Sequence, residues 1–281
     1  MAAVPLSLLA ALCWGSADFI GGIVSRRNQI PGVMLTVLGT GFLIPLAYVL
    51  VTSEAVPSAH AILFAVIGGT LGAAGLTLFY LAMSLGKLGV VTPIAASGVA
   101  VPVIVGVVGG DELPTMVAVG LALTVTGIIL TSIEGSEEEL EEDKAGGRRV
   151  VAISLLAALG LGSYFVFSKV AYEESVGWTL VFARTVAVPG LLAFVIARRV
   201  VMPAGRDRGL AVTGGTFDVA ATAFVGLALA GGALSVVAVL SSLYPVVTIF
   251  LAFFILRERL RPIQALGAFL ALAGVILIAS G

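Results

Sequence analysis

A series of long apolar stretches most constrains the fold of this chain. A helix needs about 20 residues to cross the hydrocarbon core of a bilayer, and ten such stretches follow one another, separated by short joints. Only 11% of the 281 residues are charged, whereas a typical soluble domain has about 25%. Because so few charges could not cover the surface in water, the sequence predicts an all-α integral membrane protein with ten transmembrane helices. These spans are expected near residues 4–24, 32–52, 60–84, 88–109, 114–133, 150–171, 177–197, 209–230, 234–256 and 262–280.

The rarest side chains exclude several classes of chemistry. Cys13 is the only cysteine and His60 the only histidine, so we expect no disulfide, no cysteine- or histidine-ligated metal and no Ser–His–Asp triad. The chain has no GxxxxGK[ST] motif for ATP, and its formal net charge of −1 indicates no nucleic-acid partner. Acidic side chains within the spans are too few for an intramembrane hydrolase. We therefore expect no enzymatic activity, no catalytic residues, no metal and no cofactor.

The chain contains an internal duplication. The stretch "GGTLGAAGLTLFYLAMSLGKLGVV" at 68–91 aligns without gaps with "GGTFDVAATAFVGLALAGGALSVV" at 214–237, and "LAALCWGS" at 9–16 is similar to "LAALGLGS" at 156–163. Two five-helix repeats are predicted, at 1–133 and 150–281, joined by an acidic linker at 134–149. Further matched pairs are Glu112 and Glu258, Gly120 and Gly267, and Gly127 and Gly274.

The odd number of spans in each repeat determines their relative direction. After five spans the second repeat enters the membrane from the opposite side, so the two repeats are expected to be inverted. A duplication alone also occurs in channels. Inverted repeats are typical of secondary transporters, in which the substrate site lies near the midplane where the repeats meet.

Several motifs resemble those of one transporter family. They are "ALCWGS" in the first span, the glycine-rich fourth span and the ending "SLYPVVTIFLAFFILRERLRPIQALGAFLALAGVILIAS" at 242–280. Together they resemble the EamA-type branch of the drug/metabolite transporter superfamily, with two EamA repeats covering nearly the whole chain. The resemblance implies a ten-helix secondary carrier, in a family with many exporters of amino acids, metabolites or drugs. In the first repeat the proline is closer to the glutamate than in the second, so the fourth span is expected to bend at a different level.

The distribution of basic residues predicts an orientation. Lysines and arginines follow the odd-numbered spans, and apart from Lys169 and Arg184 none lies elsewhere. Basic residues collect in cytoplasmic loops. We therefore expect the odd-numbered loops in the cytoplasm and both termini outside, in the plasma or inner membrane.

Three ionisable residues lie well inside the expected spans: Asp18, Arg184 and Asp218. An intramembrane charge is costly and by default functional. Asp18 is expected to carry a proton or bind a cationic group of the substrate, unless it is a packing carboxylate satisfied by Ser16 or a neighbouring helix. Arg184 could bind a substrate carboxylate, or it could pair with Asp218, which would account for both residues structurally.

Further candidates are aromatic and hydroxyl side chains inside the spans. Trp14 is expected either to line a cavity or to pack in the core, and buried tyrosine hydroxyls need partners. Two serines lie close to Pro102 and Pro245, where a broken helix is tolerated if it faces a cavity or another helix. The remaining candidates for substrate binding or proton coupling are thus Tyr80, Tyr164, Tyr244, Ser97 and Ser241.

The function that these features favour is secondary active transport of small metabolites by alternating access. Export of an amino acid or a drug, and coupling to protons through Asp18 and Asp218, are hypotheses; the sequence does not decide the substrate, the direction of transport or the coupling ion. A lipid or lipid-head-group flippase is the alternative that the sequence leaves open. The expected partners are a small-molecule substrate and membrane lipids, and the chain is expected to act as a monomer.

Overall fold

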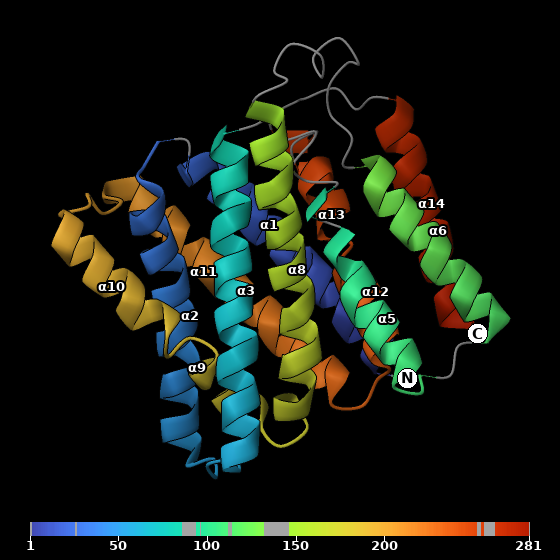
Figure 1. Ribbon diagram of the computed structural model, residues 1–281, viewed down its shortest axis with the longest axis horizontal. Coiled ribbons are helices and arrows are strands. Elements are labelled where there is room, and N and C mark those ends of the chain that lie inside the picture. The colour runs from blue at the N-terminus through green and yellow to red at the C-terminus, as the bar shows by residue number, and fades with distance from the viewer. Residues whose placement is uncertain are drawn as a thin grey trace.

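The described part of the protein consists of helices and short turns (Figure 1). In the computed structural model, the structure describes residues 2–25, 27–85, 94–95, 97–111, 114–131, 146–251, 254–255 and 262–280. No β-strand occurs among these residues. The helices are α1 (Ala3–Ser25), α2 (Ile30–Thr52), α3 (Ala59–Leu85), η1 (Ser97–Val99), α5 (Ala100–Val108), α6 (Thr115–Thr131), α8 (Gly146–Tyr172), α9 (Val176–Phe182), α10 (Ala187–Arg198), α11 (Gly205–Leu229), α12 (Leu234–Ser241), α13 (Tyr244–Leu251) and α14 (Pro262–Ser280).

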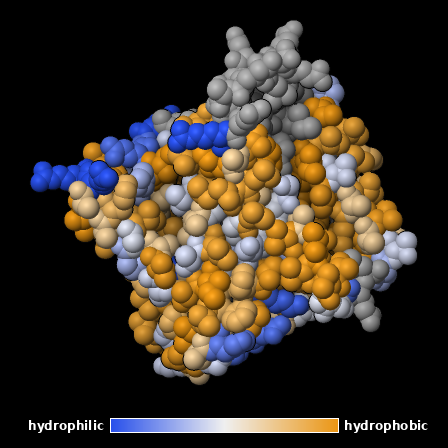
Figure 2. Space-filling model, viewed as in Figure 1, coloured by the Kyte–Doolittle hydropathy of each residue, from blue (hydrophilic) through white to orange (hydrophobic). Residues whose placement is uncertain are grey.

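The helices are those of a multi-pass membrane protein. Among the described residues, six helical segments are long and apolar enough to cross a bilayer, and four more are apolar but shorter, with 10–17 residues. Figure 2 shows a face covered mostly by apolar side chains, with hydrophilic ones gathered at its margins. Large apolar side chains such as Val51 and Val108 are more than 80% exposed, which is typical of a surface that faces lipid rather than water. The all-α membrane fold is confirmed, while the number of ten spans stays a prediction.

Pairs of antiparallel helices from the two predicted repeats form the framework. α3 lies along α8, α6 along α14 and α1 along α11, and Figure 1 shows the first two pairs side by side. Glycines let the backbones approach: a Cβ on Gly75 would lie 2.7 Å from the amide nitrogen of Leu161. In lipid, where apolar side chains gain little by leaving their surroundings, such close contacts between small residues hold helices together.

The contacts between the predicted repeats are reciprocal. α1 and α8 contain the matched stretches 9–16 and 156–163, and each packs on the third long helix of the other repeat, α11 and α3 respectively. In the α6–α14 pair, Gly120 abuts Gly274 while Gly127 abuts Gly267. A two-fold axis across the helices would produce this exchange of partners. The repeat boundaries themselves stay a prediction, and most of the linker at 134–149, like Glu112 and Glu258, lies outside the described residues.

Three of the apolar segments are interrupted. One interruption is η1, before α5; a second separates α12 from α13 at residues 242–243; and a third separates α9 from α10 at residues 183–186. The seventh span, expected as one continuous helix at 177–197, is thus two shorter helices. In each case a proline lies in the first turn of the following helix, at Pro102, Pro245 and Pro189 respectively.

Proline explains where these helices stop. It has no N–H to donate to the carbonyl four residues earlier, and its ring crowds that carbonyl. For Pro245 the affected carbonyl belongs to Ser241, the last residue of α12. A proline alone does not decide where a helix ends, because α2 continues through Pro45. Tertiary contacts also contribute. At the α9–α10 break, a Cβ on Gly69 of α3 would collide with the backbone of Ala183, so only glycine allows α3 to pack against this turn.

Replacing Gly127 by alanine should destabilise the protein, because the new Cβ would overlap the backbone of Ala271 in α14. Overpacking of this kind costs about 1–3 kcal/mol, and we expect a melting temperature several degrees lower in detergent micelles. Gly39→Ala is the matched control, since Gly39 also lies inside a helix but a Cβ there would meet no atom within 4 Å. Equal melting temperatures for the two variants would contradict the role assigned to Gly127.

Candidate functional site

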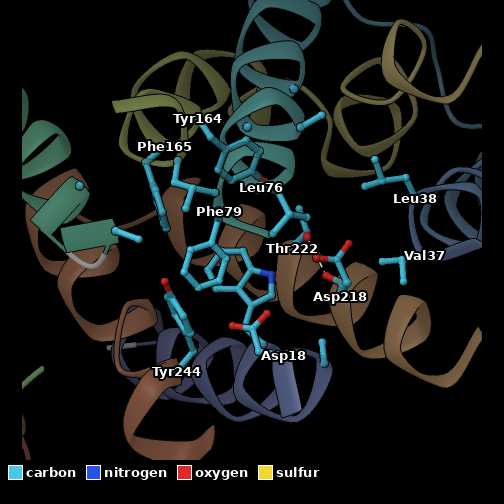
Figure 3. Close-up of a pocket in the computed structure, with 18 of the residues that line it drawn as sticks. Asp18, Val37, Leu38, Leu76, Phe79, Tyr164, Phe165, Asp218, Thr222 and Tyr244 are labelled. Carbon is cyan, nitrogen blue, oxygen red and sulfur yellow. Dashed lines mark hydrogen bonds between the residues drawn. The ribbon is translucent and has the colours of Figure 1, made fainter. Parts of the chain in front are cut away.

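A cavity of about 150 Å³ lies between the α1–α11 pair and the α3–α8 pair. Its wall also includes residues of α2 and of all three helix interruptions, namely Gly98, Arg184 and Ser242. Figure 3 shows side chains from these elements converging on one space. Interrupted helices at membrane depth are tolerated where they line a cavity. The three interruptions therefore mark the same place in the fold.

Seven of the nine site residues predicted from the sequence line this cavity, and two do not. Ser97 is exposed, and its hydroxyl donates to the carbonyl of Ile94 at 2.6 Å. Ser241 is fully buried behind the wall, while its neighbour Ser242 lines the cavity instead. The seven predicted residues that line the cavity are Trp14, Asp18, Tyr80, Tyr164, Arg184, Asp218 and Tyr244.

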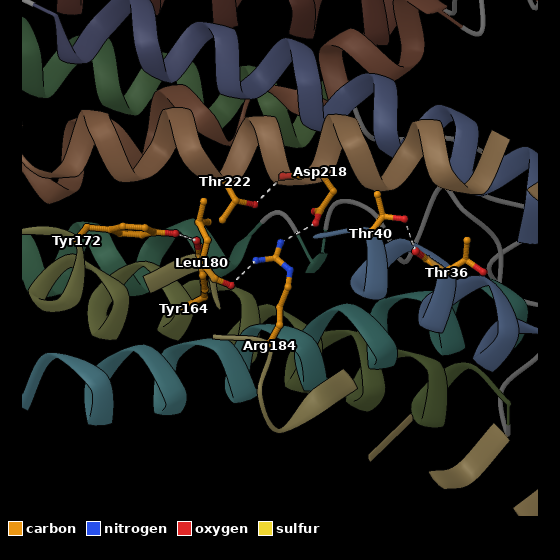
Figure 4. A network of polar contacts seen from close by, with 8 residues as sticks. All are labelled: Thr36, Thr40, Tyr164, Tyr172, Leu180, Arg184, Asp218 and Thr222. Atoms are coloured by element: carbon orange, nitrogen blue, oxygen red, sulfur yellow. Dashed lines mark hydrogen bonds and ion pairs between the residues drawn. The ribbon is translucent and has the colours of Figure 1, made fainter. Parts of the chain in front are cut away.

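Arg184 and Asp218 form an ion pair, so the structural alternative expected for them is the one observed. The Arg184 Nη2 donates to Asp218 Oδ2 at 2.9 Å, and Nη1 donates to the Leu180 carbonyl at 3.3 Å (Figure 4). The two side chains are only 8% and 15% exposed. A Cβ on Gly41 would lie 2.7 Å from Arg184 Nε, so this nitrogen faces α2. The charge of Arg184 is thus neutralised within the protein, while its Nε has no hydrogen-bond partner among the described residues.

The turn between α9 and α10 is what gives Arg184 this position. Its side chain leaves the chain at the interruption and reaches α11, where Asp218 lies in the middle of the helix. Thr222, one turn further along α11, donates to the backbone carbonyl of Asp218 at 2.6 Å. This bond lies within the helix backbone, so the partner of the Asp218 carboxylate is Arg184. Each ion needs the other, because an isolated ion in a low-dielectric medium is strongly disfavoured.

Asp18 differs from Asp218 in having no partner. Among the described residues, no hydrogen bond or ion pair reaches its carboxylate. Ser16 does not satisfy it, since the Ser16 hydroxyl donates to the carbonyl of Leu12 at 2.8 Å. Figure 3 shows Asp18 on α1 and Asp218 on α11 at the same cavity. Because Arg184 neutralises Asp218, the formal charges of the described lining residues sum to −1, and the uncompensated charge is that of Asp18.

Aromatic side chains form the wall next to Asp18. The ring of Trp14, four residues before Asp18 on α1, lies edge-on to Phe165 at 5.9 Å and to Tyr244 at 6.4 Å between centroids. Tyr164 continues this group beside Phe165, and its hydroxyl shares a hydrogen bond with Tyr172. Phe165 was missed by sequence reasoning, as were Phe79 and Thr222. An apolar ring in an apolar span carries no signal that separates cavity from core.

The cavity is closed toward one end of the bundle. Its lining residues fall in the second half of α1, the first half of α2, mostly the second half of α3, and near the middle of α8 and α11. The described lining is thus near the middle of the bundle, displaced slightly toward the ends of α1, α2 and α3 at Ser25, Ile30 and Leu85. Toward the opposite end the space is filled by a core of fully buried side chains. These include Ala10, Val225, Ala228 and Val237.

A carboxylate also joins helices at the closed end. Asp111, in the turn after α5, accepts hydrogen bonds from the backbone N–H of Ser235 at 2.9 Å and from its hydroxyl at 2.7 Å. Ser235 is in the first turn of α12, where a negative charge is favourable. At the same end, Glu174 after α8 accepts two hydrogen bonds from Ser58 before α3; these bonds lower the pKa of Glu174 below its ordinary value.

Comparisons with known proteins show what the chain is similar to. Residues 148–280 match the EamA-like transporter family. An uncharacterized protein of Methanocaldococcus jannaschii is 29% identical over 142 residues, which are 47% of this chain and 96% of that protein. A solved crystal structure is similar with a TM-score of 0.76 over 99% of this chain and 98% of its own, at 17% identity. At that identity the similarity concerns the fold.

Replacing Asp218 by asparagine should be strongly destabilising, because it leaves Arg184 as a buried cation without a counterion. Loss of one partner of a buried pair costs about 3–5 kcal/mol, to be measured as the free energy of unfolding in mixed detergent micelles. The double variant Arg184→Gln/Asp218→Asn removes both charges and should recover most of the loss. A single variant as stable as the wild type would show that the pair contributes no such energy.

Proposed function

Because residues 148–280 match the EamA-like transporter family, we propose that this membrane protein is a secondary transporter that carries a small molecule through the cavity between α1–α11 and α3–α8. The observation that supports this most directly is Asp18. Even on the lenient insertion scale, a charged side chain at the middle of a membrane helix costs about 2.5–3.5 kcal/mol. A carboxylate without a protein partner, on a cavity of molecular size, is best explained by contact with a ligand or a proton.

The size of the cavity limits the substrate. A cavity of about 150 Å³ holds a molecule about as large as benzene. Small amines and amino acids are in this range, whereas a lipid with its acyl chains is not. The volume thus favours a small metabolite or drug over the flippase alternative.

Alternating access is supported by the way the helices group. Among the helices around the cavity, the most extensive contacts join α1 to α11 and α3 to α8. We assign α12–α13 to the first group and η1–α5 to the second, and α5 also packs on α12 across the two groups. Each group contains helices of both predicted repeats, and the reciprocal contacts make them equivalent. We therefore expect these groups to rock against each other, rather than one sequence half against the other. The cavity opens between them at one end, and an exchange of their conformations would open it at the other.

The residues that close one end lie between the two groups. Asp111 follows α5 of one group and binds Ser235 in α12 of the other. Tyr172 of α8 packs on Gly226 of α11, where a Cβ would come within 2.6 Å of the tyrosine ring. By contrast, Ser58 and Glu174 both belong to the α3–α8 pair. At the opposite end, the hydrogen bond from Asn28 to Asp207 lies within the α1–α11 side.

The orientation follows from the basic residues. We propose that the odd-numbered loops are cytoplasmic and the termini outside, in the cell membrane, so that the cavity extends toward the cytoplasm. Asp18 would then be reached from the cytoplasmic side. We also propose that a proton binds Asp18 in one half of the cycle and the substrate in the other, which would couple export to the proton gradient.

Transport in proteoliposomes tests the function. A labelled panel of amino acids, purines, polyamines and quaternary ammonium compounds should include one solute whose uptake is saturable and driven by a pH gradient. Asp18→Asn should lower this uptake at least tenfold, because the variant cannot release a proton. Glu173→Gln, an exposed loop carboxylate, is the control and should transport normally. Uptake that persists after collapse of the pH gradient would overturn proton coupling. If no solute moves while fluorescent lipids are scrambled, the flippase alternative is the better one.

Breaking the contact between Asp111 and Ser235 should open the closed end more often. Hydrogen bonds to a charged group contribute about 1.5–3 kcal/mol, which corresponds to roughly a tenfold shift of a two-state equilibrium or more. In a Cys13→Ala background with Val225→Cys, the variant Ser235→Ala should react faster with an impermeant maleimide added from the side of that end.

Ser58→Ala is the matched control for this labelling experiment. It also removes a serine that binds a carboxylate at the same end of the bundle, but within one group of helices. Its labelling rate should equal that of the parent protein. If Ser58→Ala accelerates labelling as much as Ser235→Ala, the contact does not act between moving groups.

A further inference from the structure

We propose that the cavity selects a small organic monocation, whose charged nitrogen pairs with Asp18 and whose alkyl groups lie against the aromatic wall around Trp14 and Tyr244. This proposal names the chemical class of the substrate, and it rests on the proposed transport function as far as the transported solute is concerned. Binding itself can be measured without transport.

The charge balance of the cavity is the first step. Among the described residues, the charged side chains that line it are Asp18, Arg184 and Asp218, and the last two form an ion pair. Arg184 donates one hydrogen bond from Nη1 and one from Nη2 to the protein, and its Nε lies against Gly41 without a hydrogen-bond partner among the described residues. The positive charge of Arg184 is nevertheless already balanced by Asp218. A substrate with net negative charge would meet uncompensated Asp18 in a low-dielectric space, where like charges repel strongly. A single positive charge would instead neutralise the site.

The aromatic wall is the second step. Trp14 and Asp18 are four residues apart on α1 and therefore lie on the same face of the helix. Trp14 is in contact with Tyr244 and Phe165, and Figure 3 shows Tyr244 and Phe165 on the same cavity as the Asp18 carboxylate. The faces of aromatic rings attract cations within about 6 Å of the centroid, and cages of such rings recognise quaternary ammonium groups.

The same lining disfavours other cations. Metal ions such as Ca²⁺ and Mg²⁺ require about six or more oxygen ligands, and most residues around this cavity are apolar or aromatic. An organic dication would need a second free carboxylate, but Asp218 is bound to Arg184. A monovalent organic cation satisfies the one free charge and the apolar surface together.

Binding of a matched pair of probes tests the proposal. Choline carries a quaternary ammonium, and 3,3-dimethylbutan-1-ol is its uncharged carbon analogue of nearly the same shape. The chain has two tryptophans, and Trp178 lies outside the cavity lining, stacked on Phe182. In Trp178→Phe, the fluorescence of Trp14 therefore reports binding in detergent micelles. Choline should change it saturably, with an affinity at least tenfold higher than that of the neutral analogue.

Variants identify the groups responsible. Asp18→Asn should abolish the preference for choline, while Tyr244→Leu should weaken choline binding several-fold and Tyr244→Phe should retain it. The melting temperature of each variant establishes that it is folded, and the Tyr244 variants keep the proposal testable should Asp18→Asn not fold. The protein with Trp14→Phe and Trp178 retained should give no signal with either probe.

The outcomes separate this inference from the transport function. Equal affinities for the two probes, or no binding of choline, would overturn the monocation proposal. Saturable uptake of an uncharged or anionic solute in proteoliposomes would also overturn it and leave the transporter standing. Choline binding with the expected preference, but without transport of any solute, would support the cation site and contradict the transporter.

Discussion

Close backbone contact between antiparallel helices is the constraint on which the rest of this structure depends. In a membrane, burial of apolar side chains between helices gains little over contact with lipid, so packing has to come from small residues. Gly75 on α3 and Gly160 on α8 each lie against the other's backbone, and Gly127 does the same against α14. These contacts bring the matched helices of the two predicted repeats together and leave room for a cavity where larger side chains, mostly aromatic, separate them.

The helix interruptions convert this framework into a site. A continuous seventh span would carry Arg184 on one helical face, but the turn at residues 183–186 directs the side chain to Asp218. Formation of the pair offsets the cost of burying both ions. Each of the two charges is then neutralised by the other and not by a ligand. Asp18, on the facing helix α1, is then the one charged side chain of the described cavity lining without a counterion. The chemistry of the site thus depends on which charges the fold neutralises.

The grouping of the helices gives the site a direction. α5 and α12 meet at the closed end, where Asp111 binds the first turn of α12, while the cavity extends toward the other end between the same two groups. Because the groups contain equivalent helices from the two predicted repeats, a state closed at the opposite end needs no new kind of contact. A binding site that is reached from one side at a time is the minimum that a secondary transporter requires.

Composition and pattern alone determined the class of this protein, because long apolar stretches with few charges can fold only in a membrane. The repeated segments and three intramembrane charges pointed to a carrier, and the polar and aromatic candidates included seven of the residues that line the cavity. What the sequence could not decide was which of these residues act. Ser97 and Ser241 were expected at the site but point elsewhere, whereas Phe79 and Phe165 carried no signal because an aromatic ring suits a core and a cavity equally. Pro189 follows an interruption of its span, whereas α2 continues through Pro45. The α9–α10 turn is packed against Gly69 of α3. Only the tertiary structure paired Arg184 with Asp218 and left Asp18 free, because the energy of a buried charge depends on its distance from other charges in space and not on its place in the chain.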